Sequence, residues 1–245
     1  MDQVWKEKFE IKSYCVDFRQ QLKPSVLLQF FQEAASNHAQ HLGAGYNALA
    51  ERGLFWVLSR LRTEITRMPN WGETILCETW PASTEGLLFR RDFLIYDNDH
   101  NIIIRAVSGW LLVNTANLRP QRMNALGINL IDNEGKRSLD RFPARLTVNT
   151  NEICYRKKIF YNEIDQNLHV NNSQYLDWVT DCFDIHHYKH FTISAFSSEF
   201  LSEIHWGDEI ELHTGSNDKV SEVEALDYSS GNVVFKAKLE WKVCE

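Results

Sequence analysis

The sequence predicts an α+β protein in which one unit, a long helix packed on an antiparallel sheet, occurs twice. Two repeated segments carry this prediction. Asn70–Thr79 aligns with His205–Thr214, sharing a Trp-Gly pair, and Asn101–Trp110 aligns with Asn232–Trp241. The matches keep the same order and their offsets, 135 and 131 residues, are nearly equal, so duplication explains them better than chance. With 245 residues, the chain is long enough for two such units.

The first half begins with a strand-like stretch at residues 8–18. Pro24 then occupies a position where proline begins a helix, and Gly43 is a residue that commonly ends one. The helix predicted between them, Ser25–Leu42, has a broad apolar face, so we expect one side of it to be buried. From residue 54 onward, runs rich in β-branched and aromatic residues are separated by turn residues. These runs predict strands at 54–66, 73–81, 86–97 and 101–114.

The second half repeats this order of elements. It predicts a strand at 152–163, a helix at about 172–183, and strands at 192–204, 208–217, 219–228 and 231–243. His186–His190 lacks a nearby cysteine or a set of acids, so we expect an exposed loop there rather than a metal site. Between the halves, prolines, glycines and charged residues are frequent. We therefore expect an N-terminal domain at 1–125, a linker at 126–147 and a C-terminal domain at 148–245.

Composition and charge exclude several classes of protein. With 44% hydrophobic and 24% charged residues, the chain has a globular rather than a disordered or collagen-like composition. A net charge of −7 argues against a protein built mainly to bind nucleic acid. No apolar run approaches the length of a membrane helix, so we expect no membrane insertion. The charged amino terminus is not typical of a secretory signal, and the five scattered cysteines favour reduced thiols. We expect a cytoplasmic protein without a metal or other cofactor.

The most unusual local sequence is Asp165-Gln-Asn-Leu-His-Val-Asn-Asn172. Asp165, Asn167 and His169 alternate along it, and alternate side chains of an extended segment face the same side. A helix is expected to begin near Asn171 or Asn172, which would place His169 beside the positive end of a helix dipole. The alternative is a turn with only a structural role, because Asp and Asn also fill turns and cap helices.

Comparison of the two halves favours a chemical role for this motif. The corresponding stretch of the first half, Asp17-Phe-Arg-Gln-Gln-Leu22, keeps the aspartate but has neither the asparagine nor the histidine. A turn with only a structural role is expected to be similar in both copies. The asymmetry therefore indicates one chemically active copy and one copy retained for shape or for enclosing a substrate.

The chain resembles the acyl-acyl carrier protein (acyl-ACP) thioesterases of plants and bacteria, which consist of tandem hot-dog domains. The Asp165-x-Asn-x-His-Val-Asn-Asn172 motif is the most specific part of this resemblance, and the Trp56-Val-Leu-Ser-Arg60 segment distinguishes it from related acyl-CoA enzymes. Further matching segments are Glu78–Trp80, Arg91–Phe93, Ala106–Trp110 and Glu199–Glu209. The resemblance implies two hot-dog domains and hydrolysis of acyl-ACP, which releases a free fatty acid and ends chain elongation in fatty acid biosynthesis.

The resemblance also implies the catalytic residues. These are Asp165, Asn167 and His169, together with a glutamate on a strand further along. The family pattern has two acids four residues apart and uses the second, so Glu203 is the candidate and Glu199 the rival. The repeat partner of Glu199 is Glu64, which indicates a shared structural position.

The mechanism that we expect is attack by an activated water. Glu203 would act as the general base, and His169 would orient the water and later help to protonate the leaving thiol. Asn167 would hold the water or the carbonyl, and Asp165 would fix the orientation of the histidine or the asparagine. The N–H groups of residues 170–172 would stabilise the oxyanion. Several plant members have a cysteine directly after the catalytic acid, but this chain has Ile204, so a cysteine nucleophile is not available there.

The expected partner is an acyl carrier protein bearing a fatty acyl chain. The carrier is acidic, so its docking needs a local basic surface. Candidates are Arg156–Lys158, Arg90–Arg91 and the arginines in and just before the linker, namely Arg119, Arg122, Arg137, Arg141 and Arg145. Two alternatives stay open, namely an acyl-CoA thioesterase and a non-catalytic acyl-binding protein. A serine hydrolase is disfavoured because the chain has no Gly-x-Ser-x-Gly motif. Since one chain supplies both copies, a homodimer is optional.

Overall fold

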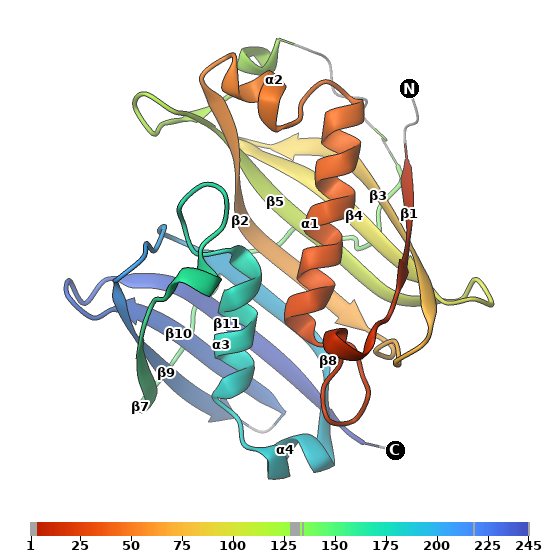
Figure 1. Cartoon of the computed structure of the whole chain (residues 1–245), viewed down its shortest axis with the longest axis vertical. Coiled ribbons are helices and arrows are strands. Elements are labelled where there is room, and N and C mark those ends of the chain that lie inside the picture. Colours follow the sequence, from red (N-terminus) through yellow and green to blue (C-terminus); the bar gives the residue numbers. More distant parts are fainter. Residues whose placement is uncertain (1–3, 128–132, 134, 218, 245) are drawn as a thin grey trace. The chain divides into compact units, whose positions relative to one another are not determined.

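The computed structural model describes residues 4–127, 133, 135–217 and 219–244. The chain divides into two compact units, Met1–Pro143 and Ala144–Glu245. In each unit a helix lies on the face of an antiparallel sheet, α1 in the first and α3 in the second (Figure 1). The predicted α+β class is therefore confirmed.

The first unit contains the longest helix of the described chain, α1 (Pro24–His41), which begins at the predicted proline. Its sheet has the strand order β1-β3-β4-β5-β2, and the short β6 also pairs with β5. The apolar face of α1 is buried, and the ring centroids of Phe31 on α1 and Phe93 on β4 lie 4.6 Å apart. The remaining elements are β1 (Trp5–Glu10), α2 (Tyr46–Ala50), β2 (Leu54–Ile65), β3 (Thr74–Glu85), β4 (Leu88–Tyr96), β5 (Ile102–Asn114) and β6 (Pro120–Gln121).

The second unit repeats this arrangement with the strand order β7-β9-β10-β11-β8. Each position in this order corresponds to the same position in the first unit, so the duplication extends to sheet topology. Tyr175 on α3 packs against Phe200 and Phe235 of the sheet beneath it. The elements are β7 (Glu152–Lys158), α3 (Asn172–Asp181), α4 (Ile185–His190), β8 (Phe191–Phe200), β9 (Glu209–Asn217), β10 (Val220–Asp227) and β11 (Val233–Val243).

The first strand of each copy is shorter than predicted. β1 ends at Glu10 rather than at residue 18, β7 ends at Lys158 rather than at residue 163, and a single 3-10 turn follows each of them. The second turn is stabilised by Glu163, whose carboxylate accepts a hydrogen bond from the Phe160 N–H (3.0 Å) and another from Trp178 Nε1 (2.9 Å). These local bonds take the chain out of the sheet before the motif begins.

Two further differences concern the connecting segments. Residues 186–190, expected to be a loop, lie in α4, because the Asp184 side chain caps this helix by accepting from the His187 N–H (2.7 Å). Of the expected linker 126–147, residues 128–132 and 134 lie outside the described residues. The part around Ser138 packs on the first unit, where its N–H and hydroxyl both donate to the buried Asp92 carboxylate.

Candidate active site

The motif residues Asp165 to His169 form a tight turn rather than an extended segment. The Asp165 N–H donates to the His169 carbonyl (2.8 Å), and the Leu168 N–H donates to the Asp165 carbonyl (3.0 Å). Leu168 has a φ of 65°, in the left-handed region. The expectation that alternate side chains face one side of an extended segment is therefore wrong. The turn forms because the Asp165 carboxylate accepts a hydrogen bond from the Asn167 N–H (2.8 Å), a local bond that competes with a strand.

A second loop, after β8, lies against this turn. The Val170 N–H donates to the Ile204 carbonyl (2.8 Å), and His169 and His205 form an antiparallel bridge. The His205 N–H donates to the Asp208 carboxylate (2.8 Å), which fixes the loop on its far side. Two loops that are distant in sequence are thus joined by their backbones at the histidine of the motif.

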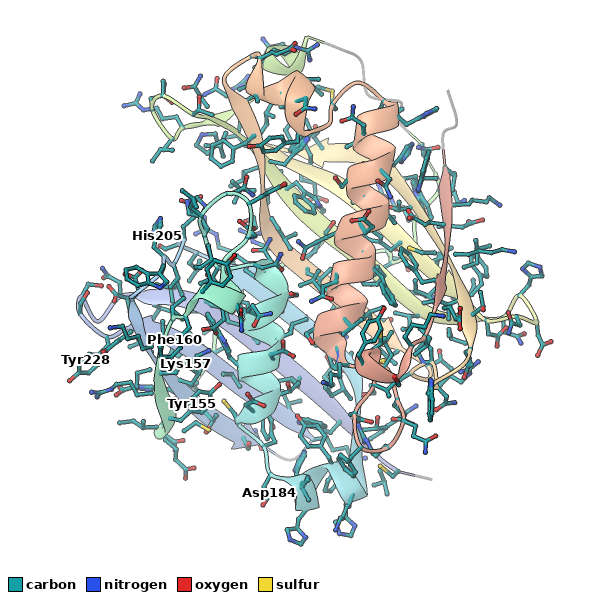
Figure 2. The ribbon with its side chains drawn as sticks, in the orientation of Figure 1. Tyr155, Lys157, Phe160, Asp184, His205 and Tyr228 are labelled. Atoms are coloured by element: carbon teal, nitrogen blue, oxygen red, sulfur yellow. The ribbon has the colours of Figure 1, made fainter. Side chains whose placement is uncertain are left out.

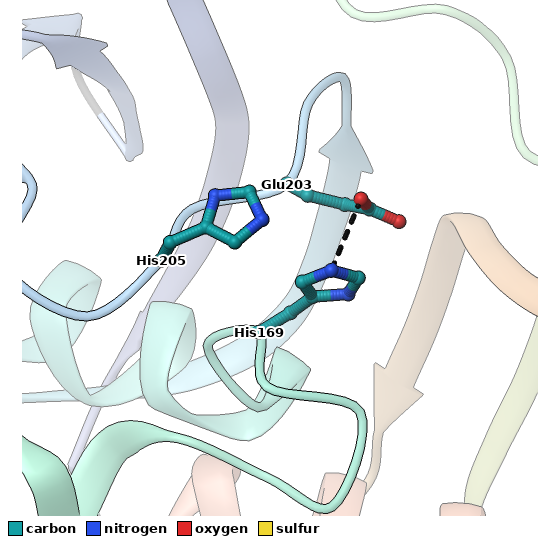
Figure 3. Close-up of side chains that lie close together, drawn as sticks. All are labelled: His169, Glu203 and His205. Carbon is teal, nitrogen blue, oxygen red and sulfur yellow. Dashed lines mark ion pairs between the residues drawn. The ribbon is translucent and has the colours of Figure 1, made fainter. Parts of the chain in front are cut away.

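This pairing brings His169 and Glu203 together. His169 Nε2 lies 3.3 Å from Glu203 Oε2, and the side chains keep 29% and 38% of their exposed area, so water and substrate can reach both (Figure 3). Glu203 lies beyond the end of β8 at Phe200, whereas the resemblance implies a glutamate on a strand.

The rival acid, Glu199, has a different environment. It is buried on β8 and accepts a hydrogen bond from the Leu146 N–H (2.8 Å), while its repeat partner Glu64 is exposed beside Arg62. The Glu199 carboxylate therefore holds the chain segment that precedes β7. Of the two candidate acids, Glu203 is the one within ion-pair distance of His169.

The expected oxyanion donors are mostly occupied. The helix α3 begins at Asn172, and the Asn171 side chain caps it by accepting from the Ser173 N–H (2.9 Å), as the sequence indicates. The Val170 N–H, however, donates to the Ile204 carbonyl, and the Asn171 N–H donates to the Glu163 carbonyl (2.9 Å). The expectation is wrong for these two amides, because the backbone uses them to join the loops.

Asp165 and Asn167 have unequal positions in the site. The Asp165 carboxylate accepts from the Asn167 N–H and so shapes the turn, whereas the sequence predicts that it fixes the orientation of the histidine or the asparagine. The Asn167 side chain is exposed on the same turn, two residues before His169. Its amide is a group that a substrate carbonyl or a water can approach from solvent.

The first copy has the same loop without the same side chains. The Asp17 N–H donates to the Gln21 carbonyl (2.8 Å), the Asp17 carboxylate accepts from the Arg19 N–H (2.9 Å), and Gln20 has a φ of 62°. By position, Gln21 replaces His169, and Met68 replaces Glu203. The backbone shape is therefore common to both copies, and the pair of titratable groups belongs to the second alone.

Sequence reasoning missed His205, which lies beside this pair. The ring centroids of His169 and His205 are 4.8 Å apart with perpendicular planes. One donor atom from each of His169, Glu203 and His205 lies within 4.8 Å of the other two. The three side chains lie close together in Figure 3. A signal was present in the repeat, because the residue that aligns with His205 is Asn70.

A buried tyrosine on α3 borders the acidic groups. Burial raises the pKa of Tyr175 well above its ordinary value, and the negative charges of Glu203, Asp165 and Asp208 raise it further. Because this pKa lies above the ordinary value of 10.0, the phenol is neutral near pH 7, and its ring packs against Phe200.

The basic residues singled out from the sequence are partly engaged in ion pairs. Arg90 is buried and its Nε lies 2.6 Å from the Asp92 carboxylate, so it is not available for docking a partner, contrary to expectation. Arg156 is exposed, but it pairs with Glu211 (2.7 Å) and its guanidinium lies 3.4 Å from the ring centroid of Tyr228. Figure 2 labels this tyrosine, which is exposed just after β10. Only some of the positive charges expected to form a docking surface are therefore at the surface.

Comparison with known proteins gives matches along nearly the whole chain. The sequence model for the N-terminal domain of acyl-ACP thioesterases matches residues 2–126, and the one for the C-terminal domain matches residues 149–243. Within the described residues, no helix has the length and apolar composition needed to cross a membrane.

Individual relatives agree with these matches. The chain is 28% identical over 263 residues to the chloroplastic dodecanoyl-[acyl-carrier-protein] hydrolase of Cinnamomum camphora, covering 98% of this chain and 68% of the relative. A crystal structure of an acyl-ACP thioesterase from Bacteroides thetaiotaomicron superposes with a TM-score of 0.89 at 27% identity, covering 98% of each chain. The structure of the 12:0-ACP thioesterase of Umbellularia californica superposes with a TM-score of 0.86 at 26% identity, covering 100% of this chain and 99% of the other.

Proposed function

The chain belongs to the acyl-ACP thioesterase family, and on that premise we propose that it releases free fatty acid from acyl carrier protein through Glu203 and His169. It is a thioester hydrolase with two tandem hot-dog domains. The observation that carries the assignment of the two residues is the 3.3 Å separation of their side chains in the second copy, at a place where the first copy has methionine and glutamine.

In the proposed mechanism, a water bound between His169 and Glu203 attacks the thioester carbonyl. Glu203 accepts a proton from the water as the new C–O bond forms, and His169 orients the water. When the tetrahedral intermediate collapses, the C–S bond breaks and the thiolate leaves. A proton passes from the Glu203 and His169 pair to the thiolate sulfur, which restores both residues. General acid–base catalysis of this kind contributes about 10²- to 10⁴-fold to the rate.

Asn167 and Asp165 have supporting roles in this proposal. The Asn167 amide N–H₂ group donates to the developing oxyanion, a contribution that helix α3 cannot make through the two amides that already bond to backbone. Asp165 is a positioning residue, because its carboxylate holds the turn that carries Asn167 and His169. A thiol nucleophile has no place here, since Ile204 is the residue that follows Glu203 and it is buried.

Substrate class and assembly are further parts of the proposal. The acyl group is delivered by a carrier protein rather than by coenzyme A, the site lies within one chain so that a homodimer is not required, and the location is cytoplasmic. The matches to acyl-ACP enzymes support the first of these statements, and the presence of both copies in one chain supports the second.

The substrate assignment is tested by measuring hydrolysis of the same acyl chains on carrier protein and on coenzyme A, side by side and over several chain lengths. We expect the carrier esters to give the higher kcat/KM at every length that reacts. Equal or faster hydrolysis of the coenzyme A esters would favour an acyl-CoA thioesterase. Tight binding of both without turnover would favour an acyl-binding protein.

A further inference from the structure

We propose that His169, Glu203 and His205 form a binding site for a divalent transition-metal ion such as Zn²⁺, and that the bound ion blocks thioester hydrolysis. The binding of the ion depends only on these three side chains. Its effect on the reaction rests on the proposed function, because two of the three donors are the groups assigned to catalysis. The metal site would therefore allow the proposed hydrolase to be inhibited reversibly.

The donors are of the type that Zn²⁺ takes in proteins. Two imidazole nitrogens and one glutamate oxygen, with a fourth position left to water, form a recurrent zinc-binding set. Metal–ligand bonds of about 2.0–2.2 Å place neighbouring ligands on a tetrahedral ion about 3.4 Å apart. His169 Nε2 and Glu203 Oε2 are already 3.3 Å apart. The three donors all lie within 4.8 Å of one another, so His205 completes the set through a side-chain movement of about 1.5 Å.

The backbone holds the three donors in register. The antiparallel bridge between His169 and His205 fixes the spacing of the two histidines, and the Val170 to Ile204 hydrogen bond (2.8 Å) fixes the loop that carries the glutamate. Donors on surface loops whose backbones are not paired would not be aligned in this way. Here the backbone is already paired, so closing around an ion requires side-chain adjustment and less loss of backbone entropy.

A carboxylate lies near Nδ1 of His205, within ion-pair distance. Asp208 Oδ2 lies 3.8 Å from His205 Nδ1, and the same oxygen accepts the His205 backbone N–H at 2.8 Å. A carboxylate beside Nδ1 favours the tautomer with its proton on that nitrogen, which leaves Nε2 as the lone-pair donor for a metal. At 3.8 Å the ring and the carboxylate are not hydrogen-bonded, so Asp208 holds the His205 backbone and acts on the ring through its charge alone.

The first copy shows that the loop does not need these side chains. At the three corresponding places it has Gln21, Met68 and Asn70, while the turn and its hydrogen bonds are the same. The acid that caps the loop also recurs, because Glu73 accepts from the Asn70 N–H (2.9 Å) as Asp208 does from His205. Within the described residues, the second copy is the one place where three such donors come together.

A metal ion bound at this site would prevent the proposed hydrolysis, because it uses the same two catalytic groups. A metal ion takes the lone pair of His169 Nε2 and the charge of Glu203, and these are the groups that orient water and accept its proton. An ion in this position therefore removes the base from the reaction. A water on the bound ion would compete with the substrate for the same space.

Binding is tested on the full chain, freed of metal by a chelator, by titration with Zn²⁺ in a calorimeter and with Co²⁺ followed by its visible absorption. We expect one ion per chain and a tetrahedral Co²⁺ spectrum. His205→Asn, which installs the residue of the first copy, should weaken binding at least tenfold, as loss of a ligand requires. His186→Asn, which changes an exposed histidine of the same unit on α4, should bind like the wild type. Equal binding by the His205→Asn variant, or no binding by the wild type at micromolar zinc, would overturn the proposal.

Inhibition is measured with each variant compared to its own chelator-treated rate. Zinc should inhibit the wild type and His186→Asn, and a chelator should restore the rate, while His205→Asn should be at least tenfold less sensitive. Acceleration by zinc, or full activity of the zinc-loaded chain, would contradict the inhibitory role. A separate result identifies failure of the proposed function, namely wild-type hydrolysis by metal-free Glu203→Gln and His169→Gln variants. In that case zinc binding that depends on His205 would still establish the metal site.

Discussion

His169 Nε2 and Glu203 Oε2 lie 3.3 Å apart although the two residues come from different loops of the second unit. Their closeness depends on main-chain bonds, of which the one from the Val170 N–H to the Ile204 carbonyl is the most direct. The Val170 and Asn171 N–H groups, just before α3, therefore join the loops that carry the pair, and they are not free to bind an oxyanion. Predictions at four other positions test the roles of the motif turn, the helix cap and two ion pairs.

The role of Asp165 is tested by comparing two substitutions. Asp165→Asn keeps an oxygen that accepts the Asn167 N–H, so we expect kcat within a few-fold of the wild type. Asp165→Ala removes the acceptor and should lower kcat by about 10²-fold, the cost of a small misplacement of the reacting groups. Asp17→Ala, in the loop of the first copy, should lower stability without lowering kcat. If Asp165→Asn is as inactive as Asp165→Ala, the negative charge itself is required.

The cap of α3 should contribute measurably to stability. Asn171→Ala removes the side-chain acceptor for the Ser173 N–H, and we expect the free energy of unfolding to fall by about 1 kcal/mol in urea denaturation. Asn171→Ser retains an acceptor, so its free energy of unfolding should fall by less. An equal loss in both variants would show that the cap bond does not stabilise the helix.

Arg90 should be a stability residue and not a docking residue. Arg90→Met leaves the Asp92 carboxylate buried without its cation, and loss of one partner of a buried ion pair costs about 3–5 kcal/mol. Urea denaturation should show this loss, and the folded variant should keep its KM for acyl-ACP. Arg90→Lys, which retains the charge, should lose less stability. A raised KM with unchanged stability would return Arg90 to the docking surface.

The ion pair of Glu211 predicts a dependence of stability on pH. Hydrogen bonds from Arg156 and then His213 hold the pKa of Glu211 below its ordinary value of 4.5. The carboxylate binds its proton less readily in the folded protein than in the unfolded chain. Its contribution to the free energy of unfolding is therefore fully present above pH 4.5 and is lost as pH falls through the lowered pKa. In Glu211→Gln, Tm should fall less steeply with acid than in the wild type. Glu152→Gln, an exposed change on β7, should keep the wild-type slope; identical slopes in all three would contradict the effect.

The fold could be predicted from the sequence where the signal is local or repeated. Pro24 marks the start of α1, the apolar periodicity from Leu27 to Ala35 marks its buried face, and the Trp-Gly repeat reveals the second copy. The end of β7 was misjudged because the hydrogen bonds accepted by Glu163 are invisible in a hydrophobicity pattern. Similarly, the sequence of α4, Ile185–His190, has little apolar periodicity, and the helix becomes apparent only from the cap that Asp184 provides.

The site could be predicted only in part. The one-sided motif and the family resemblance pointed to His169 and Glu203, whereas His205 was missed because its approach to His169 depends on a bridge between distant loops. The alternation of Asp165, Asn167 and His169 was misread for a physical reason, since an aspartate that accepts the N–H two residues ahead makes a turn. The side chains of His169 and His205 come together because the backbones of two loops pair, and this pairing cannot be read from a single sequence.

The central claim is that Glu203 is the base and His169 its partner, and single-turnover hydrolysis of acyl-ACP by chelator-treated variants tests it most directly. Glu203→Gln and His169→Gln should each slow the chemical step by about 10²- to 10⁴-fold, with carrier binding and Tm close to wild type. Glu199→Gln, the rival acid, should lose stability and keep the rate of the folded protein. Near wild-type rates in both Glu203→Gln and His169→Gln, or a loss of rate confined to Glu199→Gln, would contradict the account.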